Sequence, residues 1–132
     1  MTDGTGPLVH ERHYSVEQAN AALPWVSVRL ARIQHALDHL LSAEGTRALE
    51  LIDTAHGGGY PGRAAARATL ELLTAAAELE AVDIVLRDPQ RGLVDFPSVR
   101  DGEEVYLCWV TGEPRVSWWH EPDAGFAGRR RL

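Results

Sequence analysis

Two turn signals divide residues 93–121 into three short segments of alternating polarity. The first signal is Asp101-Gly102, because Asp and Gly tolerate the backbone angles of a tight hairpin turn. The second is the run Thr-Gly-Glu-Pro at 111–114, which is rich in turn-forming residues. We therefore expect three strands, near 93–99, 103–110 and 115–121, that form an antiparallel β-meander.

The register of this meander follows if both turns are tight. Counting outward from the first turn places Asp95 opposite Cys108, and counting from the second places Val105 opposite His120. Alternation then gives the sheet two different faces. The face expected to pack on the helices carries Val94, Phe96, Val105, Leu107, Trp109, Val116, Trp118 and His120. The other face carries Asp95, Pro97, Glu104, Tyr106, Cys108, Arg115, Ser117, Trp119 and Glu121.

The second of these faces is the candidate functional face. It places Glu104 directly opposite Glu121, with Asp95 on the same side and aromatic rings between them. Like charges directly opposite each other destabilise a sheet, so we expect an arginine, a metal ion or a carboxyl group with a raised pKa among them. The alternative is that the carboxylates point into solvent. The predicted ligand-binding residues are Asp95, Glu104, Tyr106, Trp119, Glu121 and Arg129.

Residues 122–132 have the composition of a tail that folds back onto the domain. Gly125 and Gly128 bracket Phe126, which indicates tight backbone turns around a ring that fills a pocket. Arg129 would then reach an acidic cluster or an anionic ligand.

His120 allows two interpretations. The commoner outcome for a histidine on an apolar face is a buried, neutral ring that is hydrogen-bonded to helix backbone. Alternatively, His120 and Glu121 are candidate ligands of a divalent metal ion. Cys108 would lack a general base, since His120 is expected on the opposite face. No catalytic residue or reaction follows from these residues, so whether the protein is an enzyme stays open, and its cofactor stays unknown.

Two long helices are expected before the sheet. Ser15 and Gln18 form a capping box at the start of the first helix. Pro24 lacks an N–H and clashes with the preceding turn, so this helix either breaks or kinks there. The second helix is expected from about Gly62 to Arg87. The fold class is therefore α+β: two antiparallel helices packed on a three-stranded antiparallel C-terminal β-meander.

A chain of 132 residues forms one domain. We expect a mobile tail at 1–12, a helical part at 14–88, the meander at 92–121 and the folded-back tail at 122–132. His10 and His13 fall at this mobile N-terminus, and His35 and His39 fall on the polar face of the first helix. We interpret neither pair as a metal site.

The run 56–62, His-Gly-Gly-Gly-Tyr-Pro-Gly, lies between the helices. Its first four residues resemble the oxyanion loop of some esterases, but the sequence has no G-x-S-x-G nucleophile elbow. The run also has G-x-G-x-x-G spacing, but no βαβ unit surrounds it. We interpret it as a mobile loop whose role the sequence does not define.

The second helix carries apolar residues on two sides. Leu72, Leu79 and Leu86 recur at seven-residue spacing, opposite a stripe that includes Leu70 and Leu73. A helix of this kind packs between two neighbours, either the first helix and the sheet or the first helix and a second copy of the chain. Homodimerisation through Leu72, Leu79 and Leu86 is therefore one expectation.

Composition restricts the class of partner. The formal net charge of -6 argues against a general nucleic-acid binder. No window approaches the roughly 18 apolar residues of a membrane span. A lone cysteine excludes an internal disulfide and fits a reducing compartment. We expect a cytoplasmic protein whose partners include neither nucleic acid nor a membrane.

Five short runs resemble a known family. They are YSVEQANAALP at 14–24, GLVDFP at 92–97, YLCW at 106–109, WHE at 119–121 and GFAGR at 125–129. Together they resemble the bacterial family catalogued as domain of unknown function 2203. The resemblance implies a small cytosolic protein and carries no reaction with it.

Two functions are expected from the sequence. The first is binding of a small molecule or a metal ion in a pocket formed by the meander, the C-terminal tail and a helix. The alternative is a non-enzymatic module that dimerises.

Overall fold

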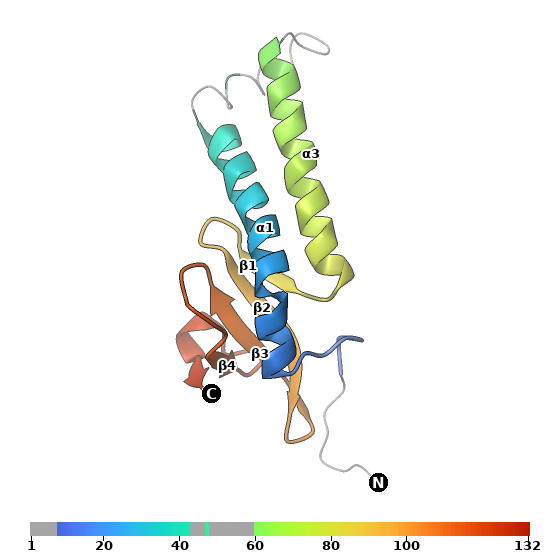
Figure 1. Ribbon diagram of the computed structural model, residues 1–132, viewed down its shortest axis with the longest axis vertical. Coiled ribbons are helices and arrows are strands. Elements are labelled where there is room, and N and C mark those ends of the chain that lie inside the picture. Colours follow the sequence, from blue (N-terminus) through green and yellow to red (C-terminus); the bar gives the residue numbers. More distant parts are fainter. Residues whose placement is uncertain (1–7, 43–46, 48–59) are drawn as a thin grey trace.

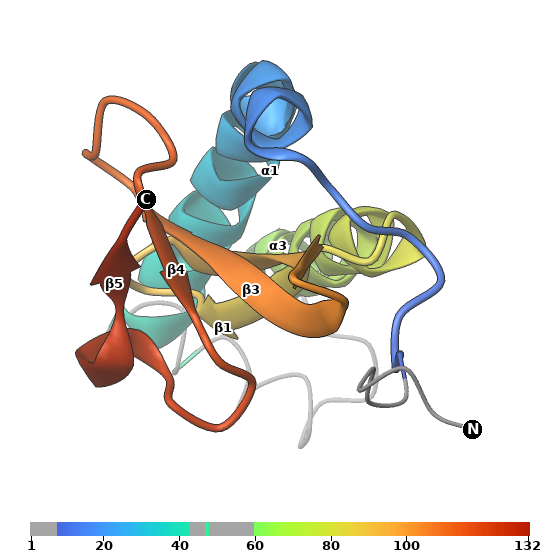
Figure 2. The same cartoon turned by 90° about the horizontal axis from the view of Figure 1, so that it is seen from below.

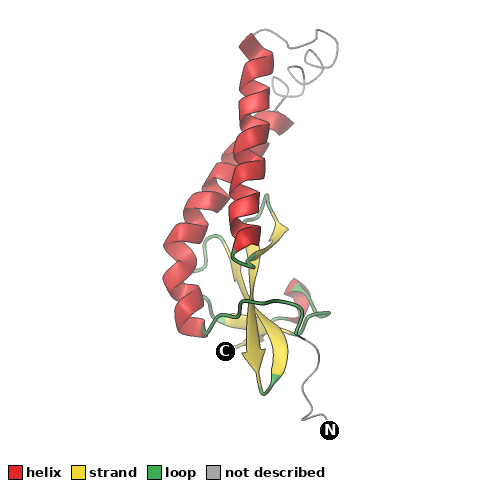
Figure 3. Cartoon of the chain, turned by 90° about the vertical axis from the view of Figure 1, so that its right-hand side faces the viewer, coloured by secondary structure: helices red, strands yellow, loops and turns green. Residues whose placement is uncertain are grey.

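The computed structural model describes residues 8–42, 47 and 60–132. A hairpin of two helices, α1 (Val16–Leu41) and α3 (Tyr60–Ala81), packs on a five-stranded sheet (Figure 1). The helices run antiparallel, and their far ends project beyond the sheet (Figure 3). The prediction of two helices followed by an antiparallel sheet is confirmed. Of the predicted loop at 56–62, residues 56–59 lie outside the described part of the chain, and α3 begins at Tyr60.

Helix α1 begins at the predicted capping box. The Gln18 amide donates to Ser15 Oγ at 3.0 Å, and the Ser15 amide donates to Gln18 Oε1 at 2.9 Å. The helix continues without interruption through Pro24, so the predicted break into two helices is wrong. Whether the helix kinks at Pro24 stays a prediction.

Helix α3 ends six residues earlier than predicted, at Ala81 rather than Arg87. Asp83 takes a left-handed φ of 63°, and the Ile84 amide donates to the Leu79 carbonyl at 3.0 Å. With the bond from the Asp83 amide to the Glu80 carbonyl, this is a Schellman motif. The following residues form a strand, because alternating apolar residues and β-branched Val85 fit a strand as well as a helix.

The sheet has five antiparallel strands in chain order, rather than the predicted three. The two additional strands come from the predicted helix end and from the C-terminal tail. A short 3-10 helix, Phe126–Gly128, precedes the last strand. The strands are β1 (Val85–Asp88), β2 (Leu93–Arg100), β3 (Glu103–Val110), β4 (Trp118–His120) and β5 (Arg130–Arg131).

The register between β2 and β3 is the predicted one. Asp101 and Gly102 have φ angles of 53° and 80°, as a tight hairpin turn requires. Asp95 lies opposite Cys108, which confirms the count outward from this turn.

The predicted register between β3 and β4 is wrong by one residue. His120 pairs with Tyr106 instead of Val105, because the connection 111–117 is not a tight turn. The Trp109 indole donates to the Glu113 carbonyl at 3.1 Å, and the Val116 amide donates to Asn20 Oδ1 of α1 at 2.8 Å. A one-residue shift moves every side chain of β4 to the other face.

The hydrophobic core lies between the helix hairpin and one face of the sheet. Its fully buried members come from both helices and from the strands: Ala19, Val26, Leu30, Ile33, Ala75, Leu79, Ile84, Val94, Phe96, Leu107, Trp109 and Val116. Trp119 packs against this core, whereas the prediction placed it on the opposite face.

The predicted dimer surface belongs to the core of a single chain. Leu79 is fully buried, and Leu72 and Leu86 pack against the same core. The exposed leucines of α3 are Leu70 and Leu73. Of the two arrangements that the apolar stripes allowed, the one within a single chain is present, and dimerisation itself stays a prediction.

No helix in the described ranges is both long and apolar enough to cross a bilayer.

Candidate metal centre

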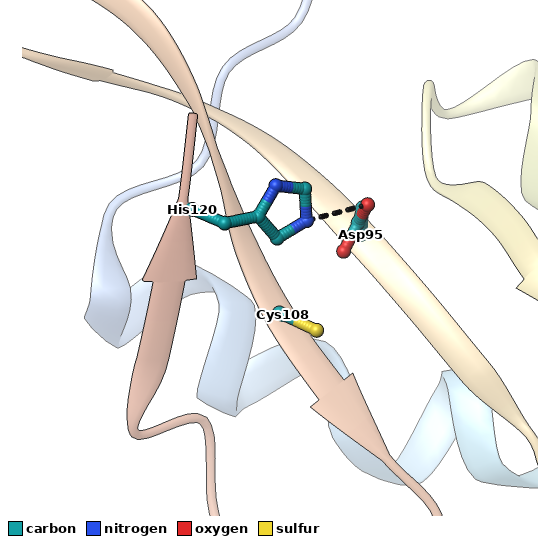
Figure 4. Close-up of side chains that lie close together, drawn as sticks. All are labelled: Asp95, Cys108 and His120. Atoms are coloured by element: carbon teal, nitrogen blue, oxygen red, sulfur yellow. Dashed lines mark hydrogen bonds and ion pairs between the residues drawn. The ribbon is translucent and has the colours of Figure 1, made fainter. Parts of the chain in front are cut away.

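Three side chains that bind transition metals meet on the face of the sheet that lies away from the helices. They are Asp95 of β2, Cys108 of β3 and His120 of β4 (Figure 4). One ligand atom from each lies within 4.8 Å of the others, and all three residues are buried. The cluster forms because the observed register of β4 turns His120 toward this face, opposite to its predicted orientation.

Both ring nitrogens of His120 are engaged. Nδ1 donates to the Glu121 carbonyl at 2.7 Å, and Nε2 lies 2.9 Å from Asp95 Oδ2. Burial alone would lower the pKa of His120, but the hydrogen bonds to Asp95 and to the Glu121 carbonyl raise it above its usual value. The ring is thus bonded to Asp95 and to the Glu121 carbonyl, rather than to helix backbone as predicted, and the bond to Asp95 favours its protonated form.

Asp95 also accepts a hydrogen bond from Arg87. The Arg87 Nε donates to Oδ2 at 2.8 Å, and the guanidinium carbon lies 4.9 Å from the centre of the Tyr106 ring. Oδ2 thus serves two donors, whereas the buried Oδ1 has no hydrogen-bond partner within the described part of the chain. An unpaired buried carboxylate oxygen is costly and needs an explanation.

Cys108 is not arranged as a nucleophile. Burial, followed by the nearby charge of Asp95, raises the pKa of its thiol to about 12, and Arg129 offsets this only in part. A catalytic thiolate needs a base that takes its proton. His120 lies on the same face but uses one nitrogen for Asp95 and the other for a carbonyl. The arrangement therefore does not support nucleophilic catalysis by Cys108.

Residues 8–13, which we name the N-terminal strap, lie against the same side of the domain. In Figure 2 they run in blue from the start of α1 past α3. The Val9 and His10 amides donate to the Glu104 carboxylate at 3.0 and 3.1 Å, and the Arg12 amide donates to Asp83 at 3.1 Å. Acidic side chains far along the sequence therefore bind the backbone of residues 9, 10 and 12, and the mobility expected of the N-terminal tail stays a prediction.

The ring of Tyr106 connects the N-terminal strap to the cluster of Asp95, Cys108 and His120. His10 Nε2 lies 2.8 Å from the Tyr106 hydroxyl, and the Tyr106 ring lies 5.6 Å from that of His120. His13 Nε2 lies 2.7 Å from Glu104 Oε2. Burial would raise the pKa of Glu104, but the hydrogen bonds from His13 and the two amides lower it overall. The partners of the Glu104 carboxylate are thus a histidine and two backbone amides of the strap.

The six residues predicted as a ligand site do not converge. Asp95 and Tyr106 lie beside His120, and Glu104 lies under the strap. The Glu121 side chain is exposed and lies 3.6 Å from Arg130, and only its backbone carbonyl contacts the cluster, at His120. Trp119 faces the core.

Arg129 has a partner within the C-terminal region. Its guanidinium contacts both carboxylate oxygens of Glu113 at 3.0 and 3.1 Å and lies over the ring of Phe126. Arg91 lies over the same ring. Arg129 and Arg131 also stack on Trp118, and Arg130–Arg131 pairs with β4.

The predictions missed Arg87 and the proximity of His120 to Cys108. Arg87 was assigned to a helix, and no sequence signal identified it as a partner of Asp95. The Asp101-Gly102 turn alone predicts that Asp95 lies opposite Cys108. His120 joins them through a register that depends on contacts between the 111–117 connection and α1.

A family model described as "Uncharacterized conserved protein (DUF2203)" matches residues 12–132. The match spans nearly the whole chain, including all three residues of the cluster, so the chain belongs to this family. No curated protein and no solved structure matches the chain.

Proposed function

We propose that this member of the uncharacterised DUF2203 family binds a divalent transition-metal ion of the zinc type through Asp95, Cys108 and His120. The observation that carries the proposal is the convergence of three buried donors from three neighbouring strands. One of these donors, Asp95, has a carboxylate oxygen without a hydrogen-bond partner among the described residues. The description of the family names no activity, so the proposal rests on this geometry.

The donor set selects the type of ion. A thiolate and an imidazole favour Zn²⁺ and chemically similar ions over Mg²⁺ or Ca²⁺, which take oxygen ligands. Ligands on a tetrahedral zinc ion with bonds of about 2.0 Å lie about 3.3 Å apart. The 2.9 Å separation of His120 Nε2 and Asp95 Oδ2 would therefore widen by only a few tenths of an ångström.

The groups around the three donors have the arrangement common around metal ligands. The hydrogen bond from His120 Nδ1 to the Glu121 carbonyl orients the ring and leaves Nε2 as the ligand atom. The bond from Arg87 orients the Asp95 carboxylate in the same way. Three protein ligands leave one position on a tetrahedral ion for water or a small molecule.

Charge balance also supports the exchange of protons for a metal ion. Binding requires Cys108 to lose its thiol proton and His120 to lose one of its two ring protons. A doubly charged ion then replaces two protons, so the net charge of the buried cluster with Asp95 and Arg87 is unchanged. This exchange avoids placing an uncompensated charge in the interior.

The competing explanation is that Arg87, Asp95 and His120 form an ion network with a purely structural role. The two explanations differ in whether Cys108 becomes a thiolate. Because the chain has a single cysteine, any thiolate-to-metal signal reports on this residue alone.

The test is a titration of metal-free protein with Co²⁺. We expect one equivalent to bind and to produce a thiolate-to-cobalt charge-transfer band, which Zn²⁺ then removes by displacement. Cys108→Ser should abolish the band, and His120→Gln should weaken Co²⁺ binding at least about tenfold while Cys108 is still present. The matched control is His35→Gln, which changes an exposed histidine of α1 and should bind as the unmodified protein does. A folded protein that gives no band would overturn the proposal in favour of the structural network.

A further inference from the structure

A cavity lies between the two helices and shares no residue with the cluster of Asp95, Cys108 and His120. Its volume is about 460 Å³, which falls within the range of about 300 to 1,000 Å³ that is typical of small-molecule sites. The residues that line it belong to the ends of α1 and α3, which project away from the sheet (Figures 1 and 3). The lining residues are Ala31, Arg32, His35, Ala36, His39, Ala64, Arg67, Ala68 and Glu71.

The cavity exists because small side chains face each other across the helix pair. Ala31 and Ala36 of α1 and Ala64 and Ala68 of α3 end at Cβ. Side chains of this size do not fill the space between the two helix backbones. The result is a cavity with an apolar floor. Nearer the sheet, the larger side chains of Leu30 and Leu79 belong to the packed core.

The walls of the cavity carry more basic than acidic groups. Among the described residues that line it are Arg32, Arg67, two histidines and one carboxylate, that of Glu71. Arg32 lies 3.8 Å from Glu71, and both side chains are about half exposed, so this pair contributes little. Within residues 8–42 and 60–132, no acidic side chain pairs with Arg67.

One polar atom of the cavity wall is buried and unpaired. Among the described residues, His39 Nε2 has no hydrogen-bond partner, and a buried polar atom of this kind needs an explanation. Its ring belongs to the same wall as His35, one helical turn away. These two histidines do not form a metal cluster with a third ligand among the described residues.

We propose that this cavity binds a small organic anion that carries an apolar group. Arg67 and Arg32 bind the acidic group by charge-assisted hydrogen bonds. The alanine floor accepts the apolar part. The proposal is independent of the metal site, because the two share no residue.

The test compares two fluorescent probes that differ in charge. Anilinonaphthalene sulfonate is an anion with an apolar body, and phenylnaphthylamine is the same body without the sulfonate. We expect saturable binding of one equivalent of the sulfonate, at least about tenfold tighter than that of the neutral probe. Arg67→Gln should weaken binding of the sulfonate about three- to tenfold and leave the neutral probe unaffected.

Matched variants complete the design. Arg63→Gln makes the same change at an exposed arginine of α3 that does not line the cavity, and it should leave both probes unaffected. Ala68→Leu fills the floor and should abolish binding of both probes. Ala64→Leu replaces it if circular dichroism shows that the first variant has lost its helices. Equal affinity for the two probes, equal effects of the two arginine variants, or full binding to the filled cavity would each overturn the proposal.

Discussion

His120 Nε2 and Asp95 Oδ2 lie 2.9 Å apart on the face of the sheet that looks away from the helices, and both side chains are 2% exposed. They come from strands β4 and β2, on either side of β3, which contributes Cys108 between them. Because Arg87 binds the same carboxylate oxygen, Asp95 is the centre of a buried network of charges. The consequences of this network for stability, reactivity and pH dependence are testable.

Asp95→Asn should destabilise the metal-free protein strongly. The amide carries no charge, so His120 and Arg87 lose their counter-ion, and removing one partner of a buried ion pair costs about 3 to 5 kcal/mol. Urea denaturation of metal-free protein measures the effect. Asp88→Asn is the control for the chemical change, since it replaces another aspartate of the sheet outside the network. Similar stability of the two variants would show that the network does not stabilise the fold.

Arg87→Gln should have a smaller effect than Asp95→Asn. The Arg87 side chain is 41% exposed, so solvent screens its charge, and His120 continues to neutralise Asp95 in the variant. We expect a loss of about 1 kcal/mol. A double-mutant cycle with His120→Gln should give a coupling free energy different from zero, because both residues bind Asp95 Oδ2. Strict additivity would contradict the shared role of that oxygen.

Cys108 should react very slowly with a thiol reagent in the folded, metal-free protein. The thiol is 1% exposed, and burial raises its pKa to about 12, so thiolate is scarce at neutral pH. Reaction with a disulfide reagent, followed by absorbance, should become fast only when urea unfolds the chain. The single cysteine makes the signal unambiguous. Rapid reaction without denaturant would show that the cluster is open to solvent.

Glu104 should make stability depend on pH in the acidic range. Its folded-state pKa is lowered below the ordinary value of 4.5, because the hydrogen bonds from the strap outweigh the effect of burial. A lowered pKa contributes stability that is present above pH 4.5 and is lost as the pH falls through the folded-state value. Thermal unfolding across this range should therefore show a steeper loss in the unmodified protein than in Glu104→Gln.

The control for that experiment is Glu103→Gln, which changes the exposed neighbouring carboxylate. It should retain the acid dependence of the unmodified protein. Hydrogen exchange adds a local readout, since the Val9 and His10 amides donate to Glu104 and should exchange faster in Glu104→Gln alone. Unchanged exchange of these amides would show that Glu104 does not hold the strap.

The elements that could be predicted are those whose determinants lie within a few residues. Ser15 and Gln18 cap α1 as expected, and Asp101-Gly102 makes the tight turn that sets Asp95 opposite Cys108. The predicted end of helix α3 lies too far along the chain, because Ile84 and Leu86 suit a helical stripe as well as a strand. The left-handed Asp83 ends the helix, and a non-glycine residue at that position gives little warning in the sequence.

The sequence by itself determined the order of two helices followed by an antiparallel sheet, and it placed two of the three residues of the cluster, Asp95 and Cys108, opposite each other. Tertiary structure decided the third, and with it the chemistry of the site. The Val116 amide donates to Asn20 of α1, and the 111–117 connection is consequently longer than a tight turn. Because strand side chains alternate, this shift of one residue moves His120 from the core to Asp95 and Cys108. Local rules specify caps and turns, whereas the register across a longer connection depends on contacts between segments that are distant in sequence.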